Sequence, residues 1–198
     1  LVKGGNGALT LSVQQSYRFN DKLSIKYGMV YNPSKNDAGF YDYYFQKDQN
    51  GNDVLKDILL SRRDLKTIEN VFSVKYNFNN RSGITFRTRH YWSKVNVKQL
   101  YDLNDDGTLT PTKHLDCSIE NRNLNIFNID AVYTLQFAPG SFINIVWKDE
   151  SFVGDDNIRY SYLKNLDNTI GSPQNNTLSV KVIYYLDYLN FKKWAKKK

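Results

Sequence analysis

Apolar and polar side chains alternate with a period of two residues along almost the whole chain. Such alternation is typical of β-strands that have one apolar and one polar face. The clearest example is 9–19, in which Leu9, Leu11 and Val13 fall on one face and Thr10 and Ser12 on the other. The pattern predicts seven strands, at 9–19, 23–31, 72–78, 84–92, 127–137, 143–148 and 178–188.

The connections between these strands alternate between short and long. Short turns lie at 20–22, 79–83 and 138–141, and long segments lie at 32–66, 93–117 and 149–176. Bacterial outer-membrane barrels pair short periplasmic turns with longer external loops in this way. The sequence therefore predicts an all-β fold, an antiparallel transmembrane β-barrel. In the first long segment, Asn50-Gly51 predicts a tight hairpin turn, and the aromatic run 40–45 suggests a hairpin that extends beyond the membrane.

Aromatic residues support this interpretation, since the chain has 15 Tyr, 11 Phe and 3 Trp. Tyr and Trp are enriched where a membrane meets water. One predicted girdle flanks the short turns and contains Tyr17, Phe19, Tyr76, Phe78, Phe86, Phe137 and Phe142. The other lies toward the long segments and contains Tyr31, Trp92 and Trp147. No run approaches the roughly 18 apolar residues that a membrane helix needs. A soluble β-sandwich or barrel is the alternative, because any β-rich protein contains many aromatic residues.

The strand count predicts an incomplete domain. If the short turns are periplasmic, the first strand starts outside the cell and the last strand ends in the periplasm. Single-chain bacterial barrels have even strand numbers, so seven strands do not close one. We expect residues 1–198 to be the C-terminal part of one outer-membrane β-barrel domain, with upstream strands and a signal peptide missing.

Charge adds one functional hint. The net charge is +7, and five of the 27 basic residues lie in the tail Lys192, Lys193, Lys196, Lys197 and Lys198. Because so much of the positive charge is in this tail, we expect no nucleic-acid partner. The polar faces of the strands carry seven basic residues, Arg18, Lys26, Lys75, Arg87, Arg89, Lys148 and Lys181. They carry three acidic residues, Glu69, Asp130 and Asp187. This predicts an electropositive lumen that favours anions. The alternative is a structural network in which these charges pair with acids on missing strands or on a plug.

One segment resembles a metal-binding loop. Asp102, Asn104 and Asp106 precede Gly107 with the spacing of the first half of a calcium loop. The twelfth position of that loop is Lys113, where a bidentate acid is needed. An Asp-Gly turn at the tip of an external hairpin is therefore the preferred interpretation. We expect no metal and no cofactor.

Catalytic candidates are few. His90 falls on the predicted lipid-facing side near Trp92, which favours an interfacial aromatic role. His114 lies near Cys117 in a long segment, and a Cys-His pair is one way to make a nucleophile. No recognised nucleophile motif surrounds any Ser, Cys or Asp. We expect a protein that is not an enzyme, with an outer-membrane hydrolase as a remaining alternative.

Several segments resemble a known family. They are Arg89-His90-Tyr91-Trp92-Ser93, Phe137-Ala138-Pro139-Gly140-Ser141, Ile145-Val146-Trp147 and 178–188, with the terminal lysines. These segments resemble the C-terminal region of an uncharacterised Bacteroidota outer-membrane protein family. Its members typically carry an N-terminal domain similar to a carbohydrate-binding module, followed by a large domain of unknown function. The resemblance covers roughly 68–198 and implies the fold and the location, but no activity and no catalytic residue.

Together these observations predict an outer-membrane barrel of unknown specificity, either a channel or transporter or a scaffold in a larger assembly. The alternative is a barrel that binds glycans or proteins at the cell surface through its long segments. Expected partners are outer-membrane lipids and lipopolysaccharide, with other outer-membrane proteins as further candidates.

Overall fold

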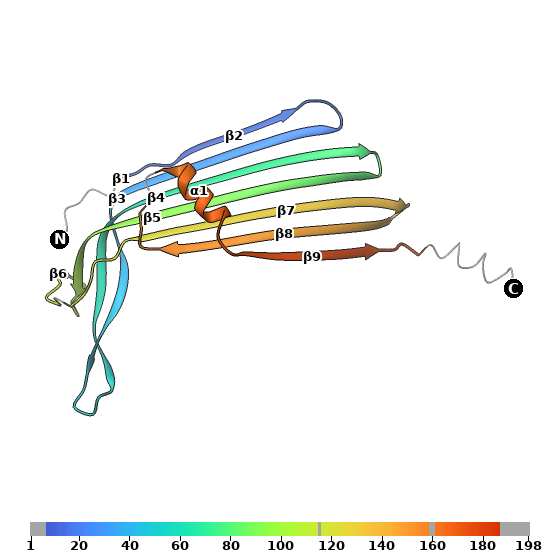
Figure 1. Ribbon diagram of the computed structural model, residues 1–198. Helices are drawn as coiled ribbons and strands as arrows, with labels where there is room; N and C mark the ends of the chain where they lie inside the picture. The colour runs from blue at the N-terminus through green and yellow to red at the C-terminus, as the bar shows by residue number, and fades with distance from the viewer. Residues whose placement is uncertain (1–6, 115, 159–160, 187–198) are drawn as a thin grey trace, which may run out of the picture.

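The computed structural model describes residues 7–114, 116–158 and 161–186 (Figure 1). Strands β1 to β5 span Gly7–Ala8, Leu11–Arg18, Leu23–Lys47, Asp53–Asn79 and Ser82–Leu103. Strands β6 to β9 span Leu109–Pro111, Arg122–Ala138, Ser141–Asp155 and Gln174–Ile183, and the helix α1 spans Tyr162–Ile170. Strands form at all seven predicted places, so the predicted all-β class is confirmed. The last strand was predicted to end at residue 188. Residues 187 and 188 lie outside the described residues, as do the terminal lysines.

All strands join one antiparallel sheet in the order β1-β3-β4-β5-β7-β8-β9. Strand β2 also pairs with β3, and β6 pairs with β5. Within the described residues the sheet is open, because β2 pairs only with β3 and β9 only with β8. None of the helices described is both long and apolar enough to cross a membrane.

The three short turns lie at one end of the sheet, and their residues explain why the chain reverses there. The Asn20 side-chain oxygen accepts hydrogen bonds from the backbone N–H groups of Lys22 and Leu23, each at 2.9 Å. Asn79 does the same for Arg81 and Ser82, at 2.8 and 2.9 Å. Such asparagine side chains stabilise turns by replacing a backbone acceptor. Gly140 supplies the positive φ of 72° that the third turn needs.

The first long segment is not a loop, which corrects the sequence interpretation of 32–66. Strands β3 and β4 run on as one hairpin of 25 and 27 residues, closed by the turn at Asn50-Gly51. The predicted hairpin turn and the extension of the aromatic run 40–45 are thereby confirmed. We call the part made by 35–65, 95–103 and 109–111 the distal extension. It bends away from the rest of the sheet in Figure 1. Register shifts between Ser34 and Asp37 and between Arg62 and Arg63 accompany the bend.

The distal extension contains nearly all the buried apolar side chains. Leu59, Val97, Leu100 and Tyr101 are buried there. The fifth, Trp92, lies in β5 next to the extension. Most of the sheet therefore has no core of its own within the described residues.

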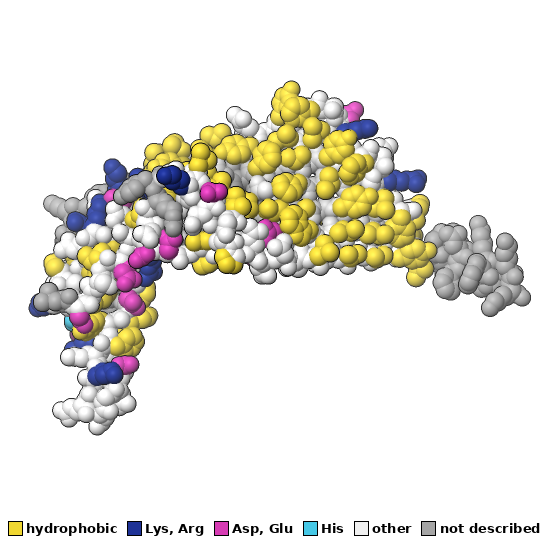
Figure 2. All heavy atoms as spheres, viewed as in Figure 1, with side chains coloured by type: hydrophobic (Ala, Val, Ile, Leu, Met, Phe, Trp, Pro, Cys, Tyr) yellow, Lys and Arg dark blue, Asp and Glu magenta, His cyan; other side chains and the backbone are white. Residues whose placement is uncertain are grey.

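The remainder of the sheet, which we call the sheet body, has one face covered with apolar side chains. The register places Ile25, Val74, Phe86, Ala131, Trp147 and Leu178 in one row across six strands. The next row on this face, which runs from Leu23 of β3 to Val180 of β9, also consists of apolar and aromatic side chains. This apolar face is the broad hydrophobic surface in Figure 2. Leu178 and Val180 are 70% and 62% exposed.

The sheet body is a single layer, and the surface area reflects this. The chain exposes 14375 Å². A compact monomer of 23.1 kDa exposes about 9,700 Å². Soluble domains bury an apolar sheet face against a second layer. Among the described residues, only α1 covers a part of that face, at its end near the distal extension (Figure 1).

The helix α1 was not predicted, although Leu163, Leu166 and Ile170 recur with a helical spacing. Ser161 caps its N-terminus by accepting a hydrogen bond from the Lys164 N–H at 3.5 Å. Its Tyr162 ring lies 5.9 Å from Trp92 and 5.3 Å from His90. His90 and Trp92 are 3% exposed, so the predicted interfacial positions of both are wrong. Phe142 is also misplaced in the predicted girdle, since it pairs with Gln136 on the opposite, polar face.

Candidate functional site

The polar face of the sheet body gathers most of the charged residues that the sequence singled out. Arg87 of β5, Asp130 of β7 and Lys148 of β8 are direct register partners on three adjacent strands. Arg89 lies one cross-strand row nearer the distal extension, and Glu69 lies two rows nearer. Asp187 lies outside the described residues. The strand pairing places these charges on one face of the sheet, as the sequence predicted.

These charges partly neutralise one another. Arg89 Nε lies 2.9 Å from Glu69 Oε1, and Lys148 Nζ lies 4.0 Å from Asp130 Oδ1. The side chains of both pairs are about a third or more exposed, so each pair contributes at most about 1 kcal/mol. Some of these charges therefore pair within this sheet, whereas the alternative of a structural network placed their partners on missing strands or on a plug.

A shallow groove of about 560 Å³ follows this charge cluster. Its polar lining includes Arg87, Arg89, Asp130, Lys148 and Glu150. Glu150 was missed in the sequence because β8 continues beyond the predicted 143–148. Lys148, Asp149 and Glu150 are all charged, so the apolar–polar alternation that identifies a strand is lost there.

Basic residues still exceed acidic ones on the polar face. Within the described part of the chain, Lys26, Lys75, Arg87 and Lys181 form no ion pair. Four unneutralised cations along one face attract anions electrostatically. The arrangement is thus suited to attracting anionic solutes rather than to one defined reaction.

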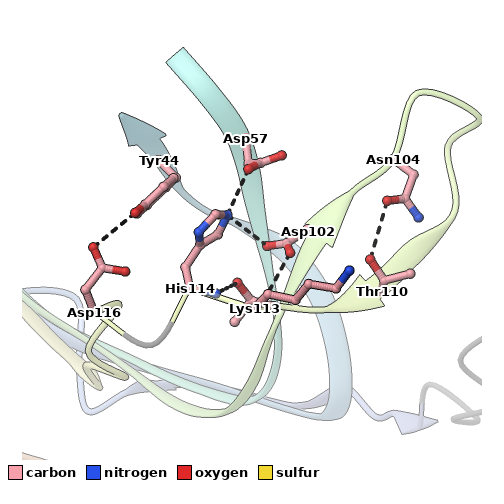
Figure 3. A network of polar contacts seen from close by, with 9 residues as sticks. Tyr44, Asp57, Asp102, Asn104, Thr110, Lys113, His114 and Asp116 are labelled. Carbon is pink, nitrogen blue, oxygen red and sulfur yellow. Dashed lines mark hydrogen bonds and ion pairs between the residues drawn. The ribbon is translucent and has the colours of Figure 1, made fainter. Parts of the chain in front are cut away.

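A second polar cluster joins the distal extension to the segment after β6 (Figure 3). His114 Nε2 lies 2.8 Å from Asp57 Oδ2 and 3.9 Å from Asp102 Oδ1. The Tyr44 ring stacks on the imidazole with the ring centroids 3.7 Å apart. Asp57 comes from β4, Asp102 from β5 and Tyr44 from β3, so three strands meet at one histidine. Protonation of His114 would strengthen its attraction to both carboxylates.

The sequence could not have found Tyr44 and Asp57 as neighbours of His114. Asp57 lies 57 residues before His114, and no spacing motif links them. The aromatic run 40–45 was the only hint that this segment is structured. The cluster attaches the segment after β6 to the distal extension.

Cys117 does not have the surroundings of a nucleophile. Partial burial raises the pKa of its thiol, and the negative charges of Asp116 and Asp102 raise it further. A raised pKa disfavours the thiolate, which is the reactive form. The hydrogen bond from Tyr44 to Asp116, 3.1 Å long, raises the pKa of the Tyr44 hydroxyl in the same area. His114 is directed at Asp57, so the structure does not assemble a Cys-His pair here.

The Asp102–Gly107 segment forms the hairpin turn between β5 and β6. The Thr108 N–H and hydroxyl both donate to Asp106 Oδ1, at 2.9 and 2.6 Å. Asn104 donates to the Thr108 hydroxyl at 2.9 Å, and Gly107 has a φ of 78°. The hydrogen bonds to Asp106 lower the pKa of its carboxyl group. Protein groups thus engage these side chains, and the described residues contain no cluster of three or more His, Cys, Asp or Glu arranged to hold a metal ion.

Comparisons with known proteins give one match. Residues 3–195 match the model of a family described as a domain of unknown function, DUF5916. No curated protein and no solved structure matches the chain. The match includes the first two predicted strands and all the long segments, so it is wider than the resemblance over 68–198. The chain therefore belongs to the DUF5916 family.

Proposed function

We propose that this chain forms part of the wall of a transmembrane β-barrel in the outer membrane of a Gram-negative bacterium of the Bacteroidota. The barrel is non-enzymatic and acts as a channel or transporter, or as a scaffold in a larger outer-membrane assembly. Its apolar face contacts outer-membrane lipids and lipopolysaccharide. Its polar face lines the lumen.

The apolar face of a single-layer sheet carries this proposal. In β7 the apolar positions run from Phe127 to Phe137, which is 11 residues and matches the 9–11 that a tilted strand needs to cross a bilayer. Exposed aromatic pairs border the short turns, with ring centroids 4.5 Å apart for Tyr17 and Phe19 and 5.2 Å apart for Tyr76 and Phe78. In water such a face favours aggregation, whereas in lipid it is the expected outer surface.

Closure of the barrel requires further strands at the edges formed by β2 and β9. An open edge in lipid leaves backbone N–H and C=O groups without partners, and each such group costs several kcal/mol. Strands from a segment outside the described residues, or from another outer-membrane protein, would pair with these edges.

The first test is mobility on a denaturing gel with the full-length protein, before and after boiling, in isolated outer membranes. A closed barrel resists the detergent and migrates differently until it is heated, so we expect a heat-dependent shift. A protein that fractionates with the soluble material and shows no shift contradicts the proposal.

The channel version is tested by conductance in planar bilayers. The excess of cations on the polar face predicts preferential passage of anions, measured as the sign of the reversal potential in a salt gradient. Replacing Arg87 and Lys26 by Gln is expected to reduce that preference. Replacing Lys56 of the extension, which is exposed and distant from the polar face, is the control. A closed barrel without conductance would favour the scaffold version.

A second candidate function has its own observation, in the distal extension. Phe40, Tyr43 and Phe45 are about half exposed and lie side by side, with centroid distances of 4.9 and 6.4 Å. Exposed aromatic groups are common at binding surfaces for sugars and proteins. Binding of glycans or a partner protein at the cell surface would be lost on replacing these three rings by Ala. The heat-dependent gel shift would remain, which separates this function from the barrel itself.

A further inference from the structure

The helix α1 has its polarity reversed relative to a helix in a water-soluble domain. Asn165 and Thr169 are fully buried against the sheet, whereas Leu163 and Ile170 are 73% and 44% exposed. A surface helix in water buries its apolar stripe and exposes its polar one. The reversal indicates that the surroundings of α1 are not water alone.

Polar contacts hold α1 on the apolar side of the sheet. The Tyr162 hydroxyl accepts a hydrogen bond from Asn70 Nδ2 at 2.9 Å, and it lies 2.9 Å from His90 Nδ1. Asn165 and Asn125 exchange side-chain hydrogen bonds with each other. These contacts attach α1 to β4, β5 and β7 without using any of its leucines.

The last turn of α1 is anchored to β8. Ser151 Oγ donates to the Thr169 carbonyl at 2.8 Å and lies 2.6 Å from Ser172 Oγ. The helix thus crosses four strands from β4 to β8 at one level along their length (Figure 1). Asn70, His90 and Ser151 belong to the cross-strand row at that level.

That level is the border of the apolar face. Toward the short turns, the next row contains Phe72 and Ile129 together with Thr88 and Asp149, and the row after it contains Val74 and Ala131. Toward the distal extension on the same side, Lys66 and Lys94 pair across β4 and β5. The Lys94 ammonium lies 4.7 Å from the Trp92 ring centroid. Lipid headgroups attract cations placed in this way.

The handedness of α1 decides which way its exposed side chains point. At 100° per residue, Leu163, Leu166 and Ile170 form one stripe beside the buried stripe, and Lys164 and Asn168 lie on the other side. A right-handed helix that rests on this face and runs from β4 to β8 directs the leucine stripe toward the short turns. It directs Lys164 and Asn168 toward the distal extension.

We propose that α1 is an interfacial helix whose Leu163, Leu166 and Ile170 contact the acyl-chain boundary of the outer leaflet, with Lys164 on the headgroup side. This inference rests on the proposed barrel function, because the apolar band beneath α1 must itself lie in lipid. An amphipathic helix at an interface buries an apolar stripe among the upper acyl chains and leaves its polar side in water. The hydrogen bonds between α1 and the sheet then hold the helix at a fixed depth in the membrane.

The test uses the full-length protein in phosphatidylcholine vesicles, with Cys117 replaced by Ser. A fluorophore is attached to a single cysteine at Leu163, Ile170 or Asn168, and at Val180 as a reference on the apolar face. Brominated acyl chains quench a fluorophore in lipid, and iodide quenches one in water. We expect L163C and I170C labels to be quenched by the brominated lipid, and the N168C label to be quenched by iodide.

The possible results separate the two proposals. If the V180C label is quenched by lipid but the L163C and I170C labels respond to iodide, α1 is not interfacial and the barrel proposal stands. If those two labels respond to neither quencher, a protein surface covers them and the inference also fails. If the V180C label responds to iodide, the barrel proposal itself is contradicted.

Discussion

The sheet body and the distal extension place apolar side chains in opposite ways, although β3, β4 and β5 run through both. In the extension, Leu59 and Leu100 are almost completely buried. In the body, Leu178 and Val180 remain largely exposed. The alternation of apolar and polar residues weakens across the bend. The extension builds a small core of its own, whereas the apolar face of the body is largely uncovered within the described residues, as the proposed contact with lipid requires.

The largest expected effect comes from placing a charge on the apolar face. Val74 lies in the middle of the apolar stretch of β4, and its neighbour Ser73 points to the polar face. Val74→Arg is expected to destabilise the membrane-inserted protein by about 2–4 kcal/mol, because arginine must leave water. The free energy of unfolding in lipid vesicles measures the effect, and Ser73→Arg is the matched control. Equal tolerance of the two substitutions would sink the lipid-facing assignment.

A smaller effect is expected in the core of the extension. Leu59→Ala removes buried methyl groups and should lower the local stability of the extension by about 2 kcal/mol. This value is at the low end for such substitutions, because a small core can collapse into the space left by the side chain. Hydrogen exchange of the extension amides measures it. Leu55→Ala, at an exposed position of the same strand, should have little effect. If Leu59→Ala also abolished the heat-dependent gel shift, the extension and the body would not be separate units of stability.

The bend between the two regions predicts a dependence on pH. Burial raises the pKa of Asp64, but hydrogen bonds from Lys98 Nζ at 2.7 Å and from the Asn36 N–H at 3.0 Å outweigh it, and the resulting pKa is lowered. A lowered pKa stabilises the folded state above the unfolded value of about 3.9. This stabilisation is lost as the pH falls through the lower, folded value.

We therefore expect the extension to lose stability from about pH 5 downward. Asp64→Asn should cost about 1 kcal/mol at neutral pH and flatten this part of the pH profile. Local hydrogen exchange at several pH values measures both quantities. Asp53→Asn, near the tip of the extension, removes a charge outside this network and serves as the control. An unchanged profile in the Asp64 variant would show that the network does not stabilise the bend.

The smallest effect is expected at the rim of the sheet body. Arg18 and Asp21 form an ion pair of 2.9 Å with highly exposed side chains. Exposed pairs of this kind contribute little, so Asp21→Ala should change the free energy of unfolding by less than about 0.5 kcal/mol. A larger loss would mean that this rim is covered by something other than solvent.

Periodicity alone located the strands of the sheet body, because a strand with one apolar and one polar face leaves a signal in every pair of neighbouring residues. It failed in the extension for a physical reason. Residues such as Lys56, Asp57, Arg62 and Arg63 are polar on both faces, since a hairpin in water needs only a few buried contacts. In the extension, the sequence feature that still predicted the structure was the local Asn50-Gly51 turn.

The helix and the histidine cluster could not be predicted, because each depends on partners distant in the chain. Tyr162 approaches His90 across 72 residues, and His114 approaches Asp57 across 57. The spacing of Leu163, Leu166 and Ile170 is a local signal for α1, but it does not reveal that the polar side of the helix faces the sheet. The same contacts explain why His90 and Trp92 were wrongly expected at an exposed position.

Strands β3 and β4 pair along the whole extension, with three register shifts, and the length of this hairpin can change without redesign of the rest. The hairpin ends in the turn at Asp48–Asn52, where Gly51 has a φ of 83° and the Asp48 carboxylate accepts the N–H groups of Asn50 and Asn52. Two residues added to each strand below this turn would lengthen its reach by roughly 7 Å and keep every side chain on its present face. One added residue would exchange the faces. Among related proteins, the height of this arm above the sheet body should accordingly vary in steps of residue pairs.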